Sequence, residues 1–139
     1  MNTLIVSSKP YKQNWVMLHD PMRLQPFLEM NQPKRVYFPF WSWKIPQEII
    51  KNFECICFHT GRLPEDAGGS PIQNLIRRGD AHTELNAIRI NDKIDGGEIL
   101  EKRPICLNGS LEEILIRISD KIEDMINVQE NNRQQNSKL

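Results

Sequence analysis

The sequence predicts an α/β protein built on a Rossmann-like open sheet, and three observations support this class. Short apolar runs alternate with helical segments along the chain, which is the order of elements in an open sheet covered by helices. The early runs are rich in Val, Ile and Phe with little polar alternation, as buried parallel strands are. The 139 residues are enough for one domain with a substantial core.

Three apolar runs are expected to form the parallel strands, at residues 3–6, 35–38 and 54–58. The first ends in a serine-containing turn, the second is closed by Pro39, and the third ends in His59. In open α/β sheets, ligands bind beyond the carboxyl ends of the strands. The three loops that follow these strands are therefore expected to converge on one crevice.

Prolines mark the helices that connect these strands. Pro21 and Pro26 divide residues 11–30 into two short helical pieces, because proline interrupts a longer helix. Pro46 suits the first position of a helix that covers residues 47–51.

The second half of the chain is expected to contain two helices separated by a β-hairpin. A capping box at residues 70–73, Ser-Pro-Ile-Gln, opens the first helix, and Gly79 ends it. Residues 85–90 and 97–103 are expected to be the strands of the hairpin, which makes the sheet mostly parallel with one hairpin. A second capping box, Ser-Leu-Glu-Glu at residues 110–113, opens an amphipathic final helix.

The end of the chain differs in composition from the rest. From about Val128 it is rich in Gln and Asn, which predicts a disordered tail over residues 128–139. Residues 1–127 are then expected to form a single domain.

Charge and cysteine content exclude some classes of function. The net charge is zero, which argues against a nucleic-acid-binding or membrane-binding surface. The cysteine count is odd and no signal peptide or long apolar run is visible, which is typical of a cytoplasmic protein with reduced thiols. Cys55 and Cys57 are two residues apart on a predicted strand, and no second pair of cysteines follows them, so no metal site is expected there.

Several spaced motifs lie between residues 35 and 115. A strand-end His59 is followed by Leu-Pro at 63–64, Gly-Gly-Ser-Pro at 68–71 and Asp-Gly-Gly at 95–97. In this order and spacing the motifs resemble the formyltransferase family, whose members pass a formyl group from 10-formyltetrahydrofolate to an amine. His59 and Asp95 are 36 positions apart (95 − 59), which agrees with that family.

The resemblance implies roles for three residues. His59 would be the acid–base group, and Asp95 its partner, fixing the imidazole or relaying its proton. Cys57 stands where the family has an Asn that donates to the oxyanion, and a thiol is a poor donor. Either backbone N–H groups replace this Asn, or activity is reduced or absent. From the residues alone, His59 could instead bond a carbonyl group, Asp95 could cap its own turn, and Cys57 could act as a nucleophile.

Binding residues follow from the same resemblance. Those expected to border the pteridine of the folate are Phe40, Trp41, Trp43, Ile45, Asn91, Ile94 and Gly96. Those expected to contact the acceptor are Lys9, Tyr11, Arg62, Gly68 and Gly69. The alternatives are that the tryptophans fill the core or a dimer contact, that the glycines shape a turn, and that Lys9, Tyr11 and Arg62 lie on the solvated surface.

The acceptor is expected to be a nucleotide-linked amino sugar. Residues 57–59, 69–75 and 102–104 resemble a small branch of the family linked to the synthesis of modified surface sugars. No glycine-rich loop of the kind found in glycinamide transformylases follows the first run, and the C-terminal domain of methionyl-tRNA formyltransferases is expected to be absent. Alternatives are a non-catalytic folate-binding or interaction module and hydrolysis of the formyl donor to formate; a homodimer is one possible assembly.

Overall fold

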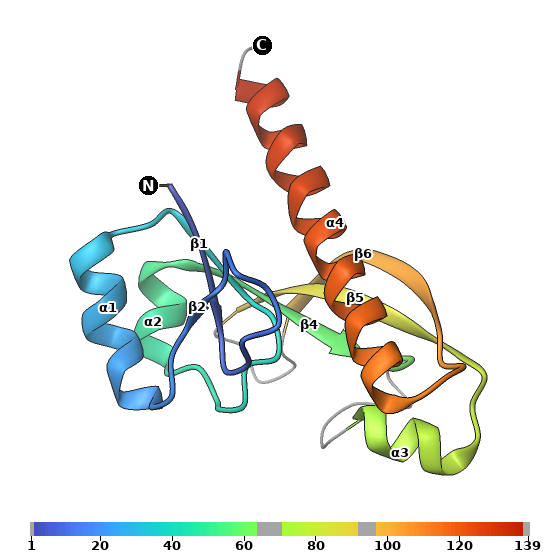
Figure 1. Cartoon of the computed structure of the whole chain (residues 1–139). Coiled ribbons are helices and arrows are strands. Elements are labelled where there is room, and N and C mark those ends of the chain that lie inside the picture. The colour runs from blue at the N-terminus through green and yellow to red at the C-terminus, as the bar shows by residue number, and fades with distance from the viewer. Residues whose placement is uncertain (1, 64–70, 92–96, 138–139) are drawn as a thin grey trace. The chain divides into compact units, whose positions relative to one another are not determined.

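The computed structural model describes residues 2–63, 71–91 and 97–137, and it confirms the α/β class (Figure 1). The strands form one six-stranded sheet in the order β2-β1-β3-β4-β5-β6. Their bounds are β1 (Thr3–Ser7), β2 (Val16–Met17), β3 (Arg35–Phe38), β4 (Glu54–Thr60), β5 (His82–Ile90) and β6 (Gly97–Cys106). The neighbours β2, β1, β3 and β4 pair in parallel, as predicted for an open sheet.

The chain groups into two compact units. The first contains residues 1–59 and 86–100, and the second contains residues 60–85 and 101–139. The division passes through β4, β5 and β6, so the first unit holds residues from every strand of the sheet. The expected single domain over residues 1–127 stays a prediction.

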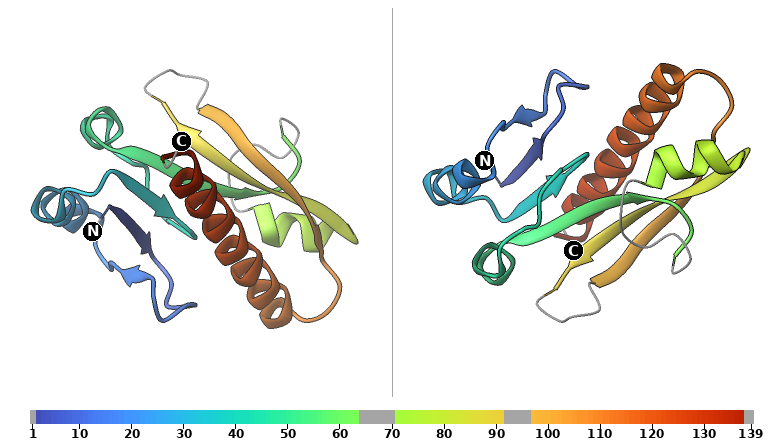
Figure 2. Two further views of the ribbon diagram at one scale, coloured as in Figure 1. Left: turned by 90° about the horizontal axis from the view of Figure 1, so that it is seen from above. Right: turned by 90° about the horizontal axis from the view of Figure 1, so that it is seen from below.

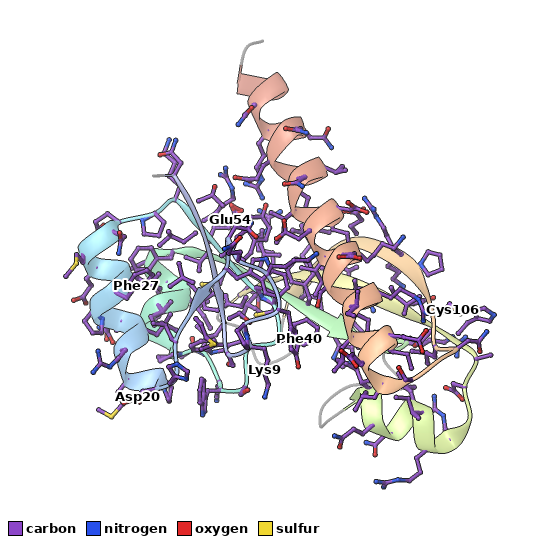
Figure 3. All side chains as sticks on the ribbon, in the orientation of Figure 1. Lys9, Asp20, Phe27, Phe40, Glu54 and Cys106 are labelled. Atoms are coloured by element: carbon purple, nitrogen blue, oxygen red, sulfur yellow. The ribbon has the colours of Figure 1, made fainter. Side chains whose placement is uncertain are left out.

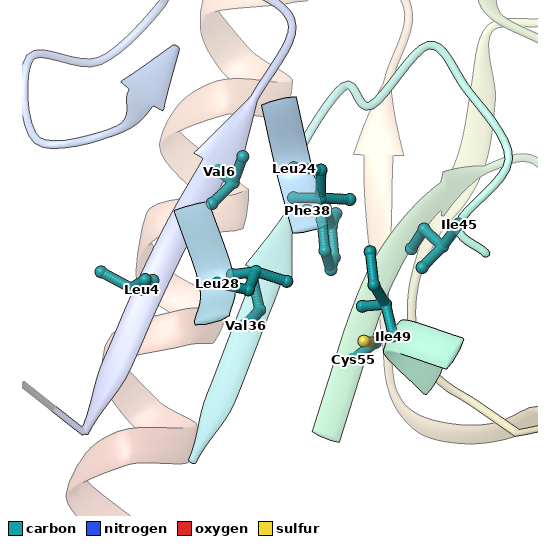
Figure 4. Close-up of a cluster of buried hydrophobic side chains, with 9 residues drawn as sticks. All are labelled: Leu4, Val6, Leu24, Leu28, Val36, Phe38, Ile45, Ile49 and Cys55. Atoms are coloured by element: carbon teal, nitrogen blue, oxygen red, sulfur yellow. The ribbon is translucent and has the colours of Figure 1, made fainter. Parts of the chain in front are cut away.

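The core of the first unit lies between one face of the sheet and two short helices (Figure 4). In the register of the parallel strands, Val36 pairs with Cys55 and Phe38 pairs with Cys57. Because side chains alternate along a strand, these positions share one face. Helices α1 (Leu24–Asn31) and α2 (Gln47–Asn52) cover that face, and the cluster consists of Leu4, Val6, Leu24, Leu28, Val36, Phe38, Ile45, Ile49 and Cys55.

The segment between β1 and β3 was predicted as two short helical pieces divided by Pro21 and Pro26; the structure has two pieces, but they adjoin at Leu24 and neither proline divides them. A 3-10 turn, η1 (Pro21–Arg23), is capped by the carboxylate of Asp20 and leads directly into α1. Pro26 falls in the first turn of α1, where the missing N–H removes no helical hydrogen bond. The short strand β2 was not predicted, because its two residues are strand only through pairing with β1 at Val6 and Ser7.

The predicted hairpin is confirmed, although its strands are longer than expected. The arrows of β5 and β6 point in opposite directions in Figure 2, and the two strands are neighbours in the sheet. The predictions of 85–90 and 97–103 fall short of the observed bounds by three residues each, at the ends remote from the turn.

The second unit contains helix α3 (Pro71–Arg78) and helix α4 (Leu111–Ser137). Gly79 ends α3 with a φ of 83°, as expected for glycine after a helix. The capping box of α4 is present: the Glu113 N–H donates to Ser110 Oγ at 3.1 Å, and the Ser110 N–H donates to Glu113 Oε1 at 3.0 Å. The buried face of α4 consists of Ile114, Ile118, Ser119, Ile122, Met125 and Ile126.

The predicted tail differs from the structure, which continues α4 from Val128 to Ser137. Gln, Glu and Arg lose little side-chain freedom in a helix, so this composition is compatible with extending one that has already formed. Gln129 also donates to Glu101 at 3.4 Å, and Arg133 lies 3.8 Å from Glu130. Among the described residues, no helix is both long and apolar enough to cross a membrane.

Candidate functional site

His59 lies near the carboxyl end of β4 with a half-buried side chain. By strand alternation its imidazole is on the same face as Cys55 and Cys57, the face that α1 and α2 cover. The β3–β4 register pairs Phe38 with Cys57, so His59 stands two residues beyond the last paired position. The imidazole is therefore at the carboxyl edge of the sheet, as predicted.

The loops after β1 and β3 contact each other in the first unit. The ring of Tyr11 meets Phe40 edge-on at 5.0 Å between centroids, and Trp15 lies 6.2 Å from the same ring. The Ser42 N–H donates to Ser8 Oγ at 2.9 Å. Lys9 and Phe40, both labelled in Figure 3, come from these two loops. Two of the three loops predicted to converge thus do meet.

Phe40 has a left-handed backbone, with a φ of 51°. This conformation is uncommon for a bulky residue and costs on the order of 1–2 kcal/mol. The aromatic contacts of Phe40 with Tyr11 and Trp15 hold the residue in place. Backbone strain of this kind is found most often at active sites and ligand-binding sites.

Trp41 joins the aromatic loop to the core. Its ring lies 5.5 Å from Phe38 and 5.1 Å from Trp43, and it packs against the core cluster that contains Ile45. Trp41 Nε1 is buried and has no hydrogen-bond acceptor among the described residues. Trp41 and Ile45 therefore contribute to packing, and the indole N–H of Trp41 is also a donor that a ligand could satisfy.

A cavity of about 490 Å³ lies beside the amino-terminal end of β4. Its lining comes from residues 50–54 and from Arg89, Ile90 and Asn91 at the end of β5. Ile90 also packs against the core cluster, and Arg89 lies 3.9 Å from Glu54 and 3.2 Å from Glu98. Asn91, predicted to bind the cofactor, thus lines a cavity with α2 and β4.

Asp95, Ile94 and Gly96 lie outside the described residues. Asn91, the described residue before them, lines the cavity with Glu54 at the start of β4. Gly97, the described residue after them, lies so close to Arg89 that a Cβ added to Gly97 would be 2.3 Å from the Arg89 carbonyl oxygen. His59 is five residues further along β4 than Glu54, about 17 Å at ~3.3 Å per residue. The pairing of His59 with Asp95 stays a prediction.

The Cys57 thiol is kept neutral by its surroundings. Burial, with a smaller contribution from Cys55, raises the pKa of Cys57 from 9.0 to about 12. Burial and the nearby Glu54 carboxylate raise the pKa of Cys55 to about 12 as well. A protonated thiol is a weak nucleophile and a weak hydrogen-bond donor. The structure therefore disfavours the alternative in which Cys57 attacks the formyl group.

The pairing of β4 with β5 reveals a residue that the sequence analysis missed. The Gly61 N–H donates to the Glu84 carbonyl at 2.8 Å. Counting two residues back along β4 and two forward along β5 in an antiparallel ladder sets His59 opposite Asn86. The same count sets Cys55 opposite Ile90, which agrees with their shared core cluster.

Asn86 is fully buried, with 0% of its surface exposed. Residues opposite each other in an antiparallel pair point to the same face, with Cβ atoms about 4.5–5.5 Å apart. The available signal was an amide two residues before Ile88 and four before Ile90, so that it alternates onto the same strand face as these two apolar residues. Only the strand pairing relates this amide to His59.

The residues predicted to contact the acceptor are not gathered by the described structure. Lys9 is exposed, and its backbone N–H donates to Ser7 Oγ at 3.0 Å. Arg62, in the second unit, donates to the His82 carbonyl at 3.3 Å. Tyr11 packs on Phe40 as described above, and Gly68 and Gly69 lie outside the described residues. These acceptor contacts stay predictions.

Comparisons with known proteins show that the chain is similar to formyltransferases. The chain is 34% identical over 90 residues to the methionyl-tRNA formyltransferase of Sulfurimonas denitrificans, a match that covers 63% of this chain and 30% of that protein. A solved methionyl-tRNA formyltransferase from Clostridium thermocellum superposes with a TM-score of 0.84 at 36% identity, over 96% of this chain and 66% of that one. No protein-family model matches the chain.

A more distant neighbour shares the fold. The structure of HypX from Aquifex aeolicus in complex with tetrahydrofolic acid superposes with a TM-score of 0.65 at 18% identity. It covers 94% of this chain and 27% of that one. The chain therefore spans only part of the length of each of these three proteins.

Proposed function

The chain belongs to the formyltransferase family, and we propose that it transfers a formyl group from 10-formyltetrahydrofolate to an amine. The observation that carries this proposal is the half-buried His59 at the carboxyl edge of β4, on the face that carries Trp41 and Cys57. A histidine has an unperturbed pKa near 6.5, so it can exchange a proton near neutral pH.

In the proposed reaction His59 moves one proton. The amine nitrogen attacks the formyl carbon and forms the new C–N bond, while the carbonyl electron pair moves to oxygen. His59 accepts the proton that the amine loses. When the intermediate collapses, the bond from the formyl carbon to N10 of the folate breaks, and His59 returns the proton to N10. The products are a formamide and tetrahydrofolate.

Cys57 occupies the position of the oxyanion donor in this proposal. Its neutral S–H offers a weaker hydrogen bond than an amide N–H would. Backbone N–H groups near the end of β4 would then carry most of the stabilisation of the oxyanion. This arrangement retains catalysis at a lower rate than an Asn at the same position would give.

The aromatic loop after β3 is proposed to hold the folate ring. A flat heterocycle fits between apolar walls that also offer a few polar groups, and Trp41 offers a buried N–H to such a ligand. Asn91 and Ile90 would border the same ligand from the end of β5. The likeness to HypX, solved with tetrahydrofolic acid, supports a folate as the formyl donor.

The proposed acceptor is the amine of a nucleotide-linked amino sugar. Its support is the resemblance of residues 57–59, 69–75 and 102–104 to the branch linked to surface sugars. A second candidate is the amine of methionyl-tRNA, because the relatives with the higher identities carry that name. A panel of nucleotide-linked amino sugars and methionyl-tRNA, each supplied with 10-formyltetrahydrofolate, separates the two by the formylated product.

The test of the reaction is the variant His59→Ala, with His82→Gln as a matched control. His82 is exposed and lies at the start of β5, so its loss should leave turnover unchanged. His59→Ala should lower kcat by about 10²–10⁴ while the Kd for a folate analogue stays the same. Unchanged turnover would remove His59 from the mechanism. A native chain that binds folate but formylates no amine would instead be a non-catalytic binding module.

A further inference from the structure

We propose that the cavity beside the amino-terminal end of β4 binds a carboxylate, with Arg89 and Lys51 as the cations that hold it. The ligand carries this carboxylate on an apolar or aromatic body, which packs on the apolar part of the cavity wall. This site goes beyond the proposed function, because the proton transfer assigned to His59 takes place at the other edge of the sheet.

The cavity is separate from the carboxyl edge of the sheet. Its volume is about 490 Å³, and its wall combines residues 50–54 with the end of β5, all within the first unit. Along β4, Glu54 is about 17 Å from His59 at ~3.3 Å per residue. Figure 3 shows Glu54 apart from Lys9 and Phe40, which belong to the loops at the carboxyl edge.

Arg89 is the cation on the β5 side of the cavity. Its Nε is buried and has no hydrogen-bond partner among the described residues. Its two ion pairs are weak: the pair with Glu54 is 3.9 Å long, beyond hydrogen-bond distance, and the pair with Glu98, at 3.2 Å, involves a carboxylate side chain that is 67% exposed. A buried N–H without an acceptor is destabilising, and a carboxylate oxygen is the acceptor that a guanidinium binds best.

Lys51 is the cation on the α2 side. It lies in the last turn of α2 with an exposed side chain, and it has no ion pair within the described part of the chain. Glu54 is the acidic residue of the described cavity wall, so the two cations leave this wall with more positive than negative charge. A ligand with a negative group therefore complements the cavity.

The apolar part of the wall defines the body of the ligand. Ile50, Phe53 and Ile90 line the cavity, are partly buried and pack against the core cluster. Apolar walls with a few charged groups are typical of sites for small organic acids. Such a carboxylate has two sources: the glutamate end of the formyl donor, which an aminobenzoyl group separates from the folate ring, or a separate aromatic acid. Only the first source rests on the proposed function.

The experiment measures the Kd of two carboxylate probes by NMR titration. The probes are para-aminobenzoylglutamate, which represents the end of the folate, and benzoate, with para-aminobenzamide as the uncharged reference. Arg89→Met and Lys51→Met should each raise the Kd of a bound carboxylate about tenfold, because a charge-assisted contact is lost, and should leave the reference unchanged. Arg23→Met is the matched control, since Arg23 is exposed on η1 and does not line the cavity.

The Nε–H of Arg89 provides a readout that a merely structural role would not move. Its proton–nitrogen signal can be assigned by its loss in Arg89→Met. The signal should shift as a carboxylate probe is added to the native chain, and it should stay in place when para-aminobenzamide is added. Added salt should weaken the binding of the probe, because the cavity opens to solvent at the exposed Lys51.

The results separate the two sources and test the site itself. Binding of para-aminobenzoylglutamate alone supports the folate end as the ligand, and binding of benzoate as well supports a separate acid. Binding of neither probe, or an equal Kd in the native chain and both cavity variants, would overturn the inference. If Arg89→Met does not fold, Lys51→Met still decides, because Lys51 is exposed.

Formyl transfer is scored independently of these titrations. A native chain that binds the carboxylate probes through Arg89 and Lys51 but formylates no amine would sink the proposed function alone. A chain that transfers the formyl group, yet binds the probes equally well without either cation, would sink the carboxylate site alone.

Discussion

Removal of the Cys57 thiol separates two roles for this residue. If Cys57 is only a weak donor near the oxyanion, Cys57→Ala and Cys57→Ser should keep formyl transfer within about tenfold of the native rate. If Cys57 instead carried the formyl group as a thioester, either change would stop transfer. Loss of a nucleophile costs on the order of 10⁶ in kcat in well-studied hydrolases. The structure predicts the first result.

The expected loss of Cys57 reactivity on folding can be worked out from the environment of the thiol. Burial raises the pKa of Cys57 from 9.0 to about 12. Each pKa unit changes the thiolate fraction tenfold at a pH below both values, so folding lowers the thiolate of Cys57 by up to about a thousandfold. Alkylation consumes the thiolate, and its rate at pH 8 should fall by a similar factor relative to the unfolded chain.

The assay is labelling with iodoacetamide, with each cysteine quantified by peptide mass spectrometry in native buffer and in urea. Cys55 should be protected like Cys57, because burial raises its pKa to about 12 as well. Cys106→Ala is the control for activity, since this half-buried thiol belongs to the other unit. The reasoning fails if folded Cys57 is labelled as fast as in urea, or if a formyl-thioester is trapped on it.

Three further predictions concern stability and cofactor binding. The pKa of Cys57 is raised on folding, so the unfolded chain loses this proton first. The contribution of this thiol to the free energy of unfolding should therefore be constant below pH 9 and fall between pH 9 and 12, and urea titrations in which Cys57→Ala loses as much stability over that range as the native chain would contradict it. Ser110→Ala removes the cap of α4 and should lower the free energy of unfolding by about 1 kcal/mol in urea denaturation; an unchanged value would show that the cap does not stabilise the helix. Trp41→Phe removes a buried N–H and should weaken folate binding about tenfold by calorimetry without destabilising the free protein; equal affinity would show that Trp41 does not bond the ligand.

The local elements of this protein could be read from its sequence. The box at Ser110 and Glu113 forms as its letters predict, because its hydrogen bonds join residues three apart. Gly79 ends α3 because it tolerates a positive φ at no steric cost. The position of His59 at a strand end also follows from the chain alone, since the apolar run before it stops there.

Other features depended on neighbours distant in the chain. Val16 and Met17 form a strand only because β1 offers its edge. The residues after Val128 are helical as a continuation of α4, whereas their composition alone suggested disorder.

The sequence by itself determined that a histidine and a thiol share one face of β4 at the end of a buried run. Only the tertiary structure decided which side chain stands opposite that histidine. The reason is that strand register is set by backbone hydrogen bonds such as that from Gly61 to Glu84, and a slip of one residue would turn Asn86 to the other face.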